Sequence, residues 1–365
     1  MLEKRKQILQ MVEEGKLTVD EALTLLNSLE ANPEANPEPA VNVNTSSQLT
    51  PYVGKSSSSS STFKPSSASF KEKLFSFVDQ TVKKVKDVDL DFNFGPSFKV
   101  QHIFQQTEAY IQAIDIDIAN GSVKVKPWGS PDVRIECESD VYKVEGQEQA
   151  RQAFLKDVLF SIENGKLKFN VQKKHMKVKA TVYIPETEYE RVNLRVFNGP
   201  IEGERLNVRE LKAKTANGLI RFYEVNSGQL EAETSNGHIE LSRVFSSKCE
   251  METINGSIKF DGDYKKIDAQ TFNGDIEGYL KGERIELAFL KTTTGHIEFY
   301  TPSHLGIEGD LKSNLGKFVC NLPQMEVIEE KKETVMKQMR FRAYLEAAKS
   351  YKLLAESKAG SITVK

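Results

Sequence analysis

A short phrase that recurs along the second half of the chain limits the folds that it can adopt. From Arg191 to Phe299 the pattern apolar-x-apolar-x-Thr-x-Asn-Gly-x-Ile-x-apolar repeats, and the glycines of successive copies are 19, 19, 19, 18 and 21 residues apart. A steady period of this length is typical of stacked supersecondary units, each of which buries an apolar face against its neighbours. The sequence therefore predicts a repeat domain with corners at Asn120, Gly121, Asn198, Gly199, Asn217, Gly218, Asn236, Gly237, Asn255, Gly256, Asn273, Gly274, Gly295, Gly316 and Gly360.

The copy from Leu211 to Phe222 shows how the phrase specifies a turn. Alternation places its apolar residues on one strand face, and Gly218 permits the positive φ of a sharp turn. Asn-Gly can then form either a hairpin of an antiparallel meander or a corner of a solenoid, in which equivalent residues stack about 4.8 Å apart. We favour the solenoid, because asparagine and threonine recur in register and stacked asparagines can form a ladder. The predicted fold is mainly β: a β-solenoid with coils of about 19 residues and a small N-terminal α-hairpin on a flexible linker.

Residues 1–30 have the pattern of a helical hairpin. Gly15 is placed to end the first helix, and Thr18-x-x-Glu21 is a capping box that begins the second. So short a hairpin buries too little surface to be robust alone. We therefore expect it to dock on a second copy in a homo-oligomer, on a protein partner or on the rest of the chain.

Two segments separate this hairpin from the repeats. Residues 31–69 are rich in proline and serine and predict a disordered linker. Residues 70–86 regain helical periodicity, with lysines flanking one apolar side. This helix could lie on an anionic membrane surface or pack on the repeat domain. Packing is favoured, because apolar helical faces more often serve a protein core. The membrane or docking face would consist of Phe70, Leu74, Phe77, Val78, Val82 and Val85.

The repeat domain is expected to span residues 88–365. Residues 145–157 interrupt its two-residue alternation with helical spacing and predict an inserted helix that covers an end of the stack. Asn164-Gly165 predicts a hairpin between 158–162 and 166–171. The last residues, 353–364, return to the repeat phrase and close the chain.

The sequence contains no motif that predicts catalysis. His238 and His296 both follow a repeat glycine, but three coil steps would separate them by about 14 Å, too far for one metal ion. Asp261 and Asp263 flank Gly262 and are explained by a turn. A column three residues past each glycine predicts weak surface ion pairs: Glu202, Arg221, Glu240, Lys259, Glu277 and Glu298. We therefore expect no catalytic, cofactor or metal site and no enzyme activity.

Composition and termini limit the partners and the location. The net charge is -2, so no basic excess points to nucleic acid. The charged N-terminus lacks the apolar core of a signal peptide, and no run approaches the roughly 18 apolar residues of a membrane span. We expect a cytoplasmic protein, either free or peripheral at the inner face of the cell membrane.

Two phrases resemble known families. Gln7-Ile8-Leu9, Glu14 to Thr18, Glu21-Ala22 and Leu25-Leu26 resemble the SHOCT-like hairpin of Gram-positive bacterial proteins, and Thr-x-Asn-Gly-x-Ile resembles the bacterial adhesin-type β-strand-repeat family. Together these resemblances cover nearly the whole chain except the linker, and they imply a β-solenoid and a link to cell-envelope stress. The leading hypothesis is a non-enzymatic scaffold or interaction protein. The alternatives are a membrane-surface binder that uses residues 70–86, and a solenoid that binds or acts on glycans.

Overall fold

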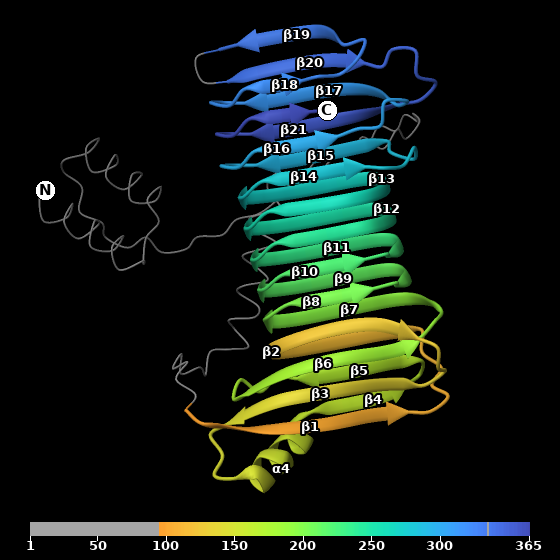
Figure 1. Cartoon of the computed structure of the whole chain (residues 1–365), viewed down its shortest axis with the longest axis vertical. Helices are drawn as coiled ribbons and strands as arrows, with labels where there is room; N and C mark the ends of the chain where they lie inside the picture. Colours follow the sequence, from red (N-terminus) through yellow and green to blue (C-terminus); the bar gives the residue numbers. More distant parts are fainter. Residues whose placement is uncertain (1–94, 334–335) are drawn as a thin grey trace, which may run out of the picture. The chain divides into compact units, whose positions relative to one another are not determined.

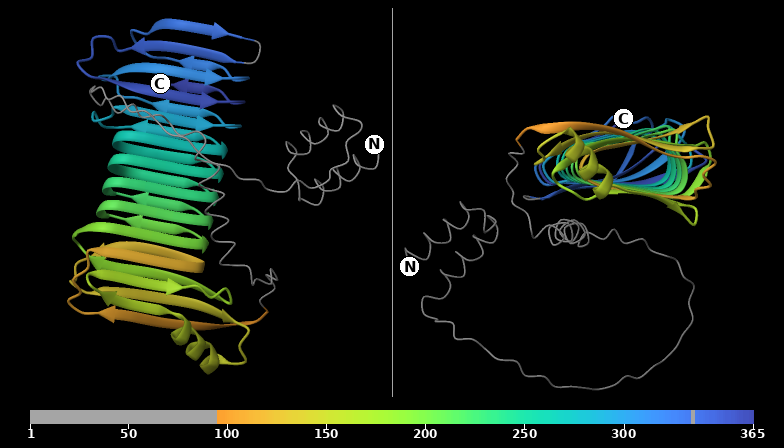
Figure 2. Two further views of the ribbon diagram at one scale, coloured as in Figure 1. Left: turned by 180° about the vertical axis from the view of Figure 1, so that it is seen from behind. Right: turned by 90° about the horizontal axis from the view of Figure 1, so that it is seen from below.

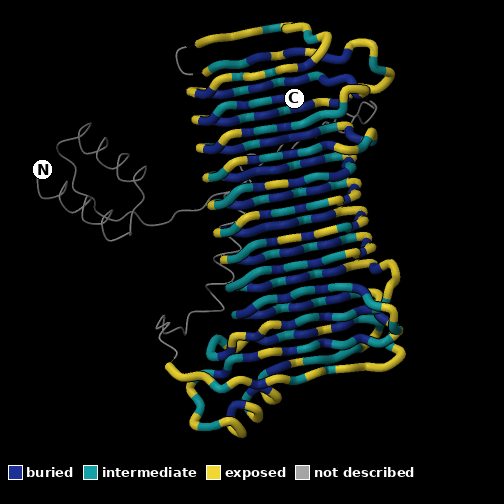
Figure 3. Tube along the Cα trace, in the orientation of Figure 1, coloured by how far each residue is buried: buried dark blue, intermediate teal, exposed yellow. Residues whose placement is uncertain are grey.

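The computed structural model describes residues 95–333 and 336–365, which form strands β1 to β22 and the helix α4 (Figure 1). The prediction of a mainly β fold is confirmed. The predictions for residues 1–30, 31–69 and 70–86 fall outside the described residues. Within the described residues, buried and outward-facing positions alternate along almost every strand (Figure 3). The buried residues form one continuous core that runs through the stack.

The centre of the stack is built from parallel strands whose partners lie one repeat apart. Asn217 of one coil is the partner of Asn198 on one side and of Asn236 on the other. This parallel register is that of stacked, solenoid-like coils, and the antiparallel meander is not formed here. The longer strands, in order along the stack, are β7 (Glu188–Asn198), β9 (Asn207–Asn217), β11 (Asn226–Asn236), β12 (Ile239–Asn255), β13 (Ile258–Asn273) and β15 (Leu287–Thr292).

Short strands form the opposite side of each coil. Seen along the stack, the coils are flattened loops with two long sides (Figure 2). The core residues lie between these two sides. The short strands are β8 (Ile201–Glu204), β10 (Ile220–Tyr223), β14 (Ile276–Leu280) and β16 (Ile297–Tyr300), and the first halves of β12 and β13 complete this side. Their inward isoleucines form one buried column: Ile201, Ile220, Ile239, Ile258, Ile276 and Ile297.

The repeat phrase explains the corners. The buried hydroxyl of Thr234 donates a hydrogen bond of 3.1 Å to the carbonyl of Gly218 in the preceding coil. A Cβ at Gly237 would lie 1.9 Å from the same carbonyl oxygen, so only glycine fits. The prediction of a positive φ at Gly218 is wrong: the positive φ values among these corner glycines occur at Gly121, Gly199 and Gly274. Close approach of neighbouring backbones, rather than an unusual φ, requires glycine at Gly218 and Gly237.

The first copy of the repeat, in strand β2, lies between strands that come much later in the sequence. Strand β2 (Ala113–Trp128) lies between β7 and β8 on one side and β5 (Lys166–Val171) and β6 (Met176–Pro185) on the other. Beyond them the pairing becomes antiparallel, with β3 (Val133–Tyr142) on β6, β1 (Ser97–Gln106) on β3, and β4 (Leu159–Glu163) on β5.

Helix α4 (Gln147–Asp157) lies at this end of the stack, within the segment for which a helix was expected (Figure 1). Its buried face consists of Ala150 and Phe154. The Phe154 ring lies 6.2 Å from the ring of His102 and 6.3 Å from that of Phe104, both in β1. The helix therefore covers apolar surface that the last coil would otherwise expose to water.

The last repeat is also inserted. Strand β21 (Ser350–Ser357) lies between β15 and β17 (Gly306–Ser313), and β22 (Ile362–Val364) lies between β16 and β18 (Phe318–Cys320). Strand β20 (Lys337–Ala343) then adds antiparallel to β17, and β19 (Glu326–Lys332) adds antiparallel to β20. The C-terminal phrase forms a repeat as expected, but it does not lie at the end of the stack, because β17 to β20 extend beyond it.

Candidate interaction surface

The outward side chains of the longer strands form a surface that we call the long-strand face. It comprises β7, β9, β11, β15 and the second halves of β12 and β13. The corresponding surface over the short strands is called the short-strand face. On both faces, outward residues that are one repeat apart in the sequence lie beside each other, because the strands are parallel and in register.

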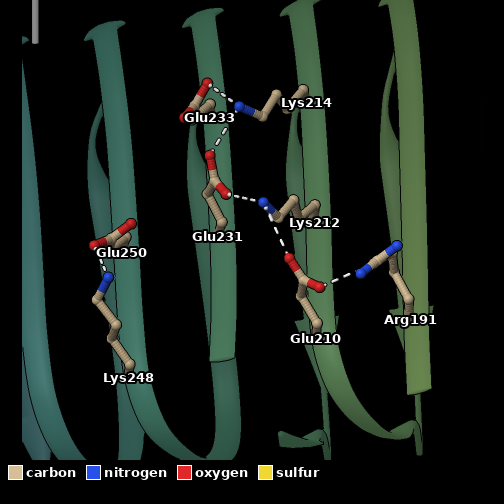
Figure 4. A network of polar contacts seen from close by, with 8 residues as sticks. All are labelled: Arg191, Glu210, Lys212, Lys214, Glu231, Glu233, Lys248 and Glu250. Carbon is tan, nitrogen blue, oxygen red and sulfur yellow. Dashed lines mark hydrogen bonds and ion pairs between the residues drawn. The ribbon is translucent and has the colours of Figure 1, made fainter. Parts of the chain in front are cut away.

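A network of ion pairs crosses the long-strand face (Figure 4). Glu210 contacts Arg191 of the preceding strand at 2.9 Å and Lys212 of its own strand at 3.1 Å. Lys212 also contacts Glu231 at 3.2 Å. Lys214 lies 2.8 Å from Glu231. The network therefore links β7, β9 and β11 on one surface.

The network continues at its most buried point. Lys214 lies 2.9 Å from Glu233, which is only 6% exposed although it points away from the core. Burial, aided by the hydrogen bond with Glu231, raises the pKa of Glu233 to about 7. Burial acts against ionisation of Glu231 too, but its hydrogen bonds with Glu233 and Lys214 outweigh burial and lower its pKa. The two carboxyl groups therefore share one proton near neutral pH.

Two groups of residues extend this network across the long-strand face. Five carboxylates occupy neighbouring outward positions on β11, β12 and β13, namely Glu231, Glu233, Glu250, Glu252 and Asp268. A column of mainly apolar residues runs between them and the asparagine corners, formed by Phe197, Ala216, Ser235, Ile254 and Phe272. The long-strand face thus combines an acidic cluster with an apolar column.

The short-strand face carries the charged column that the sequence predicts. Arg221 lies 2.7 Å from Glu240, and Lys259 lies 2.9 Å from Glu277, each pair joining neighbouring coils. The Tyr279 and Tyr300 rings stack beside this column with centroids 4.3 Å apart. These groups are largely exposed, so each ion pair contributes little to stability.

The structure gives the two singled-out histidines a structural role. His238 accepts a hydrogen bond of 3.0 Å at Nδ1 from the backbone N–H of Ser257 in the next coil. His296 accepts one of 3.0 Å from the N–H of Ser361. Both therefore join neighbouring coils. No group of three or more His, Cys, Asp or Glu residues that could hold a metal ion occurs within residues 95–333 and 336–365.

The turn predicted around Asp261 and Asp263 is wrong in form, because both residues lie within strand β13. Strand β13 passes here from the short-strand side to the long-strand side. A Cβ at Gly262 would lie 1.9 Å from the Val244 carbonyl oxygen, so two backbones approach closely at this position. Asp261 accepts the backbone N–H of Arg243 at 2.9 Å, and Asp263 pairs with Arg284 at 3.0 Å. These carboxylates bind neighbouring coils together.

The sequence-predicted corner residues lie together in one column. The side-chain amide of Asn236 donates a hydrogen bond of 2.9 Å to the side-chain oxygen of Asn217. The corner glycines, from Gly121 at one end to Gly316 at the other and including Gly360, approach the backbone of the neighbouring coil closely and form a second column beside the asparagines. The predicted face of residues 70–85 lies outside the described residues. The ion-pair network of Figure 4 was not predicted from the sequence, although a pattern in the sequence indicates it. Charged residues recur four and six positions before several repeat glycines, as with Glu231 and Glu233 before Gly237.

No helix in the described part of the chain is both long and apolar enough to cross a membrane. The fold defines the described part of the chain as a repeat-built β-protein of stacked coils. The chain belongs to the family described as Toastrack DUF4097, whose model matches residues 111–364. A second model, the SHOCT-like domain, matches residues 3–34. The family resemblance seen in the sequence is therefore confirmed.

One sequence relative agrees with this assignment, and several solved structures are similar to part of the chain. The chain is 45% identical to YvlB of Bacillus subtilis strain 168 over 367 aligned residues, covering 100% of this chain and 99% of that protein. Among solved structures, a "putative adhesin" from Parabacteroides merdae is 13% identical, covers 73% of this chain and 96% of its own, and has a TM-score of 0.38. One from Bacteroides fragilis is 10% identical, covers 73% and 97%, and has a TM-score of 0.35.

Proposed function

We propose that this chain is a non-enzymatic interaction protein of the bacterial cell-envelope stress response. The resemblance of both its hairpin and its repeats to envelope-associated bacterial proteins supports this setting. We place it in the cytoplasm, either free or peripheral at the inner face of the cell membrane. The solenoid-like stack is its rigid body, and the N-terminal hairpin of residues 1–30 supplies contact with a partner or a second copy.

The long-strand face carries the proposal. It is flat, extends over successive coils and presents an acidic cluster beside an apolar column, with its charges held in place by the contacts of Figure 4. A rigid surface of this kind binds a partner with little loss of conformational entropy. Its carboxylates favour a partner segment that is basic and amphipathic.

A complementation experiment tests this function. Cells that lack the protein should respond abnormally to an antibiotic that acts on the cell wall, and the wild-type chain should restore the response. The double variant Glu231→Lys/Glu250→Lys should fail to restore it, because the acidic cluster becomes basic. Glu240→Lys/Glu277→Lys makes the same charge change on the short-strand face and should restore it. Equal restoration by both variants would show that the long-strand face is not the functional surface.

A further inference from the structure

Three outward residues of the long-strand face are nearly as buried as the core. The exposed fractions are 6% for Glu233, 7% for Ser235 and 9% for Phe289, although all three point away from the interior. On the short-strand face of the same stack, Tyr223 is 39% exposed. The Ser235 hydroxyl is buried and has no hydrogen-bond partner within the described part of the chain. This face therefore has the burial of a contact surface.

The geometry points to one occupant, and we propose that residues 70–86 of this same chain dock as a helix along the long-strand face. The proposal rests on the proposed function, since it names what that surface binds. It decides between the two interpretations of this segment in favour of packing on the repeat domain.

The chemistry of the two surfaces matches. Residues 70–86 contain five lysines and two acidic residues, which gives a net charge of +3 (5 − 2). Their apolar side would cover the column from Phe197 to Phe272, and the flanking lysines would lie over the acidic cluster. Charge complementarity of this kind orients a docked helix, while apolar contact stabilises it.

The dimensions also match. A helix of 17 residues is about 25 Å long, and the four coil steps from Phe197 to Phe272 span about 19 Å. Strands β1, β3, β6, β2 and β8 are consecutive neighbours, so about 19 Å separates β1 from the coil that contains Phe197. Residues 87–94 connect the segment to the start of the described chain, and eight residues can extend to about 28 Å.

Hydrogen–deuterium exchange of the full-length protein, read by mass spectrometry, tests the docking. The amides of residues 70–86 should be protected in the wild type. Ser235→Arg places a long charged side chain beneath the proposed helix and should accelerate their exchange about tenfold or more. Val78→Asp, on the apolar side of the segment, should do the same. Ser242→Arg, on the short-strand face, should leave their exchange unchanged, and protection of β11 and β12 reports whether each variant is folded.

Two results would overturn the proposal. Unprotected amides in the wild type would show that the segment does not dock; if that protein also pelleted with phosphatidylglycerol vesicles but not with phosphatidylcholine vesicles, the membrane interpretation would replace it. Protection that survives Ser235→Arg in a folded protein would place the segment elsewhere. Neither result depends on the complementation experiment. Loss of the docking with retained sensitivity to Glu231→Lys/Glu250→Lys would reject this occupant and keep the surface.

Discussion

The side-chain amide of Asn217 donates a hydrogen bond of 2.7 Å to the side-chain oxygen of Asn198, one repeat earlier. Asn236 makes the same contact with Asn217, and Asn255 makes it with Asn236, each at 2.9 Å. Each asparagine inside the ladder is therefore both a donor and an acceptor. A slip of one residue between two coils would break this ladder and would also turn the buried threonines outward. The ladder thus helps to fix the register of the stack.

Removing one member of the ladder should measure its contribution. Asn236→Ala deletes the hydrogen bonds to Asn217 and from Asn255, and we expect it to lower the free energy of unfolding by about 1–2 kcal/mol. Urea denaturation measures the change. Lys248→Ala, a substitution in the next strand that removes only a half-exposed ion pair with Glu250, should change the free energy of unfolding by less than about 0.5 kcal/mol. If the two variants were equally stable, the ladder would add nothing to stability.

A methyl group at a repeat glycine should be far more damaging. The Cβ of Gly237→Ala would lie 1.9 Å from the Gly218 carbonyl oxygen, so two coils would have to separate. We expect a loss of more than about 3 kcal/mol or a failure to fold. Gly129→Ala is the matched control, because nothing lies within 4 Å of its added Cβ. Thermal unfolding of the two variants compares them, and near-equal melting temperatures would contradict the close-packed corner.

The buried carboxyl of Glu233 should make stability depend on pH. Its pKa is raised to about 7 in the folded protein against a reference of 4.5, so the folded state holds a proton that the unfolded state releases. Its stabilising contribution is therefore present at and below pH 4.5 and is lost as the pH rises to about 7. We expect a decrease of about 1–3 kcal/mol across this window.

The variant Glu233→Gln tests the assignment, because it cannot ionise. Urea denaturation at several pH values should show the decrease in the wild type and a smaller slope in the variant. Glu240→Gln, on the short-strand face, should retain the wild-type slope. An unchanged slope in Glu233→Gln would mean that another group causes the pH dependence.

Much of the central stack could be predicted because each coil is specified by a short phrase in its own sequence. The types of residue at Thr215, Asn217 and Gly218 recur at the same places in most of the central coils, and their period indicates which residues become neighbours. The ends could not be predicted in this way. Nothing in the phrase around Asn120 shows that β2 will pair with strands some 50 and 80 residues later in the chain, because that choice depends on which edge is left open.

The candidate surface was harder to predict than the corners. Glu233 alternates with buried Thr234 and Ala232, so its outward direction follows from strand periodicity. Its burial and its shared proton depend on Lys214 and Glu231, and their positions follow only once parallel register is established. Phe289 looks like a core residue in the sequence, yet its backbone position faces outward beside Asp268.

Deletion of residues 1–30 should separate assembly from folding. The hairpin predicted there is too small to be stable alone, so we expect it to mediate contact between copies or with a partner. The shortened chain should keep the far-ultraviolet circular dichroism of a β-protein but show a smaller assembly by light scattering. A chain with the linker residues 40–60 deleted is the control and should keep its assembly size. An unchanged size after deletion of 1–30 would count against self-association through the hairpin.

Strand β21, which is inserted between β15 and β17, should couple the stabilities of these two neighbouring strands. Leu353 in β21 is fully buried, and β21 pairs with β15 on one side and with β17 on the other. Leu353→Ala should therefore cost about 2–5 kcal/mol locally and accelerate amide exchange in both strands. Exchange in β9 and β11, several coils away, should change little, because each coil contacts only its neighbours. If β17 alone lost protection, the strand would close an end instead of joining two parts of the stack. Equal loss throughout the domain would instead show that the stack unfolds as one cooperative unit.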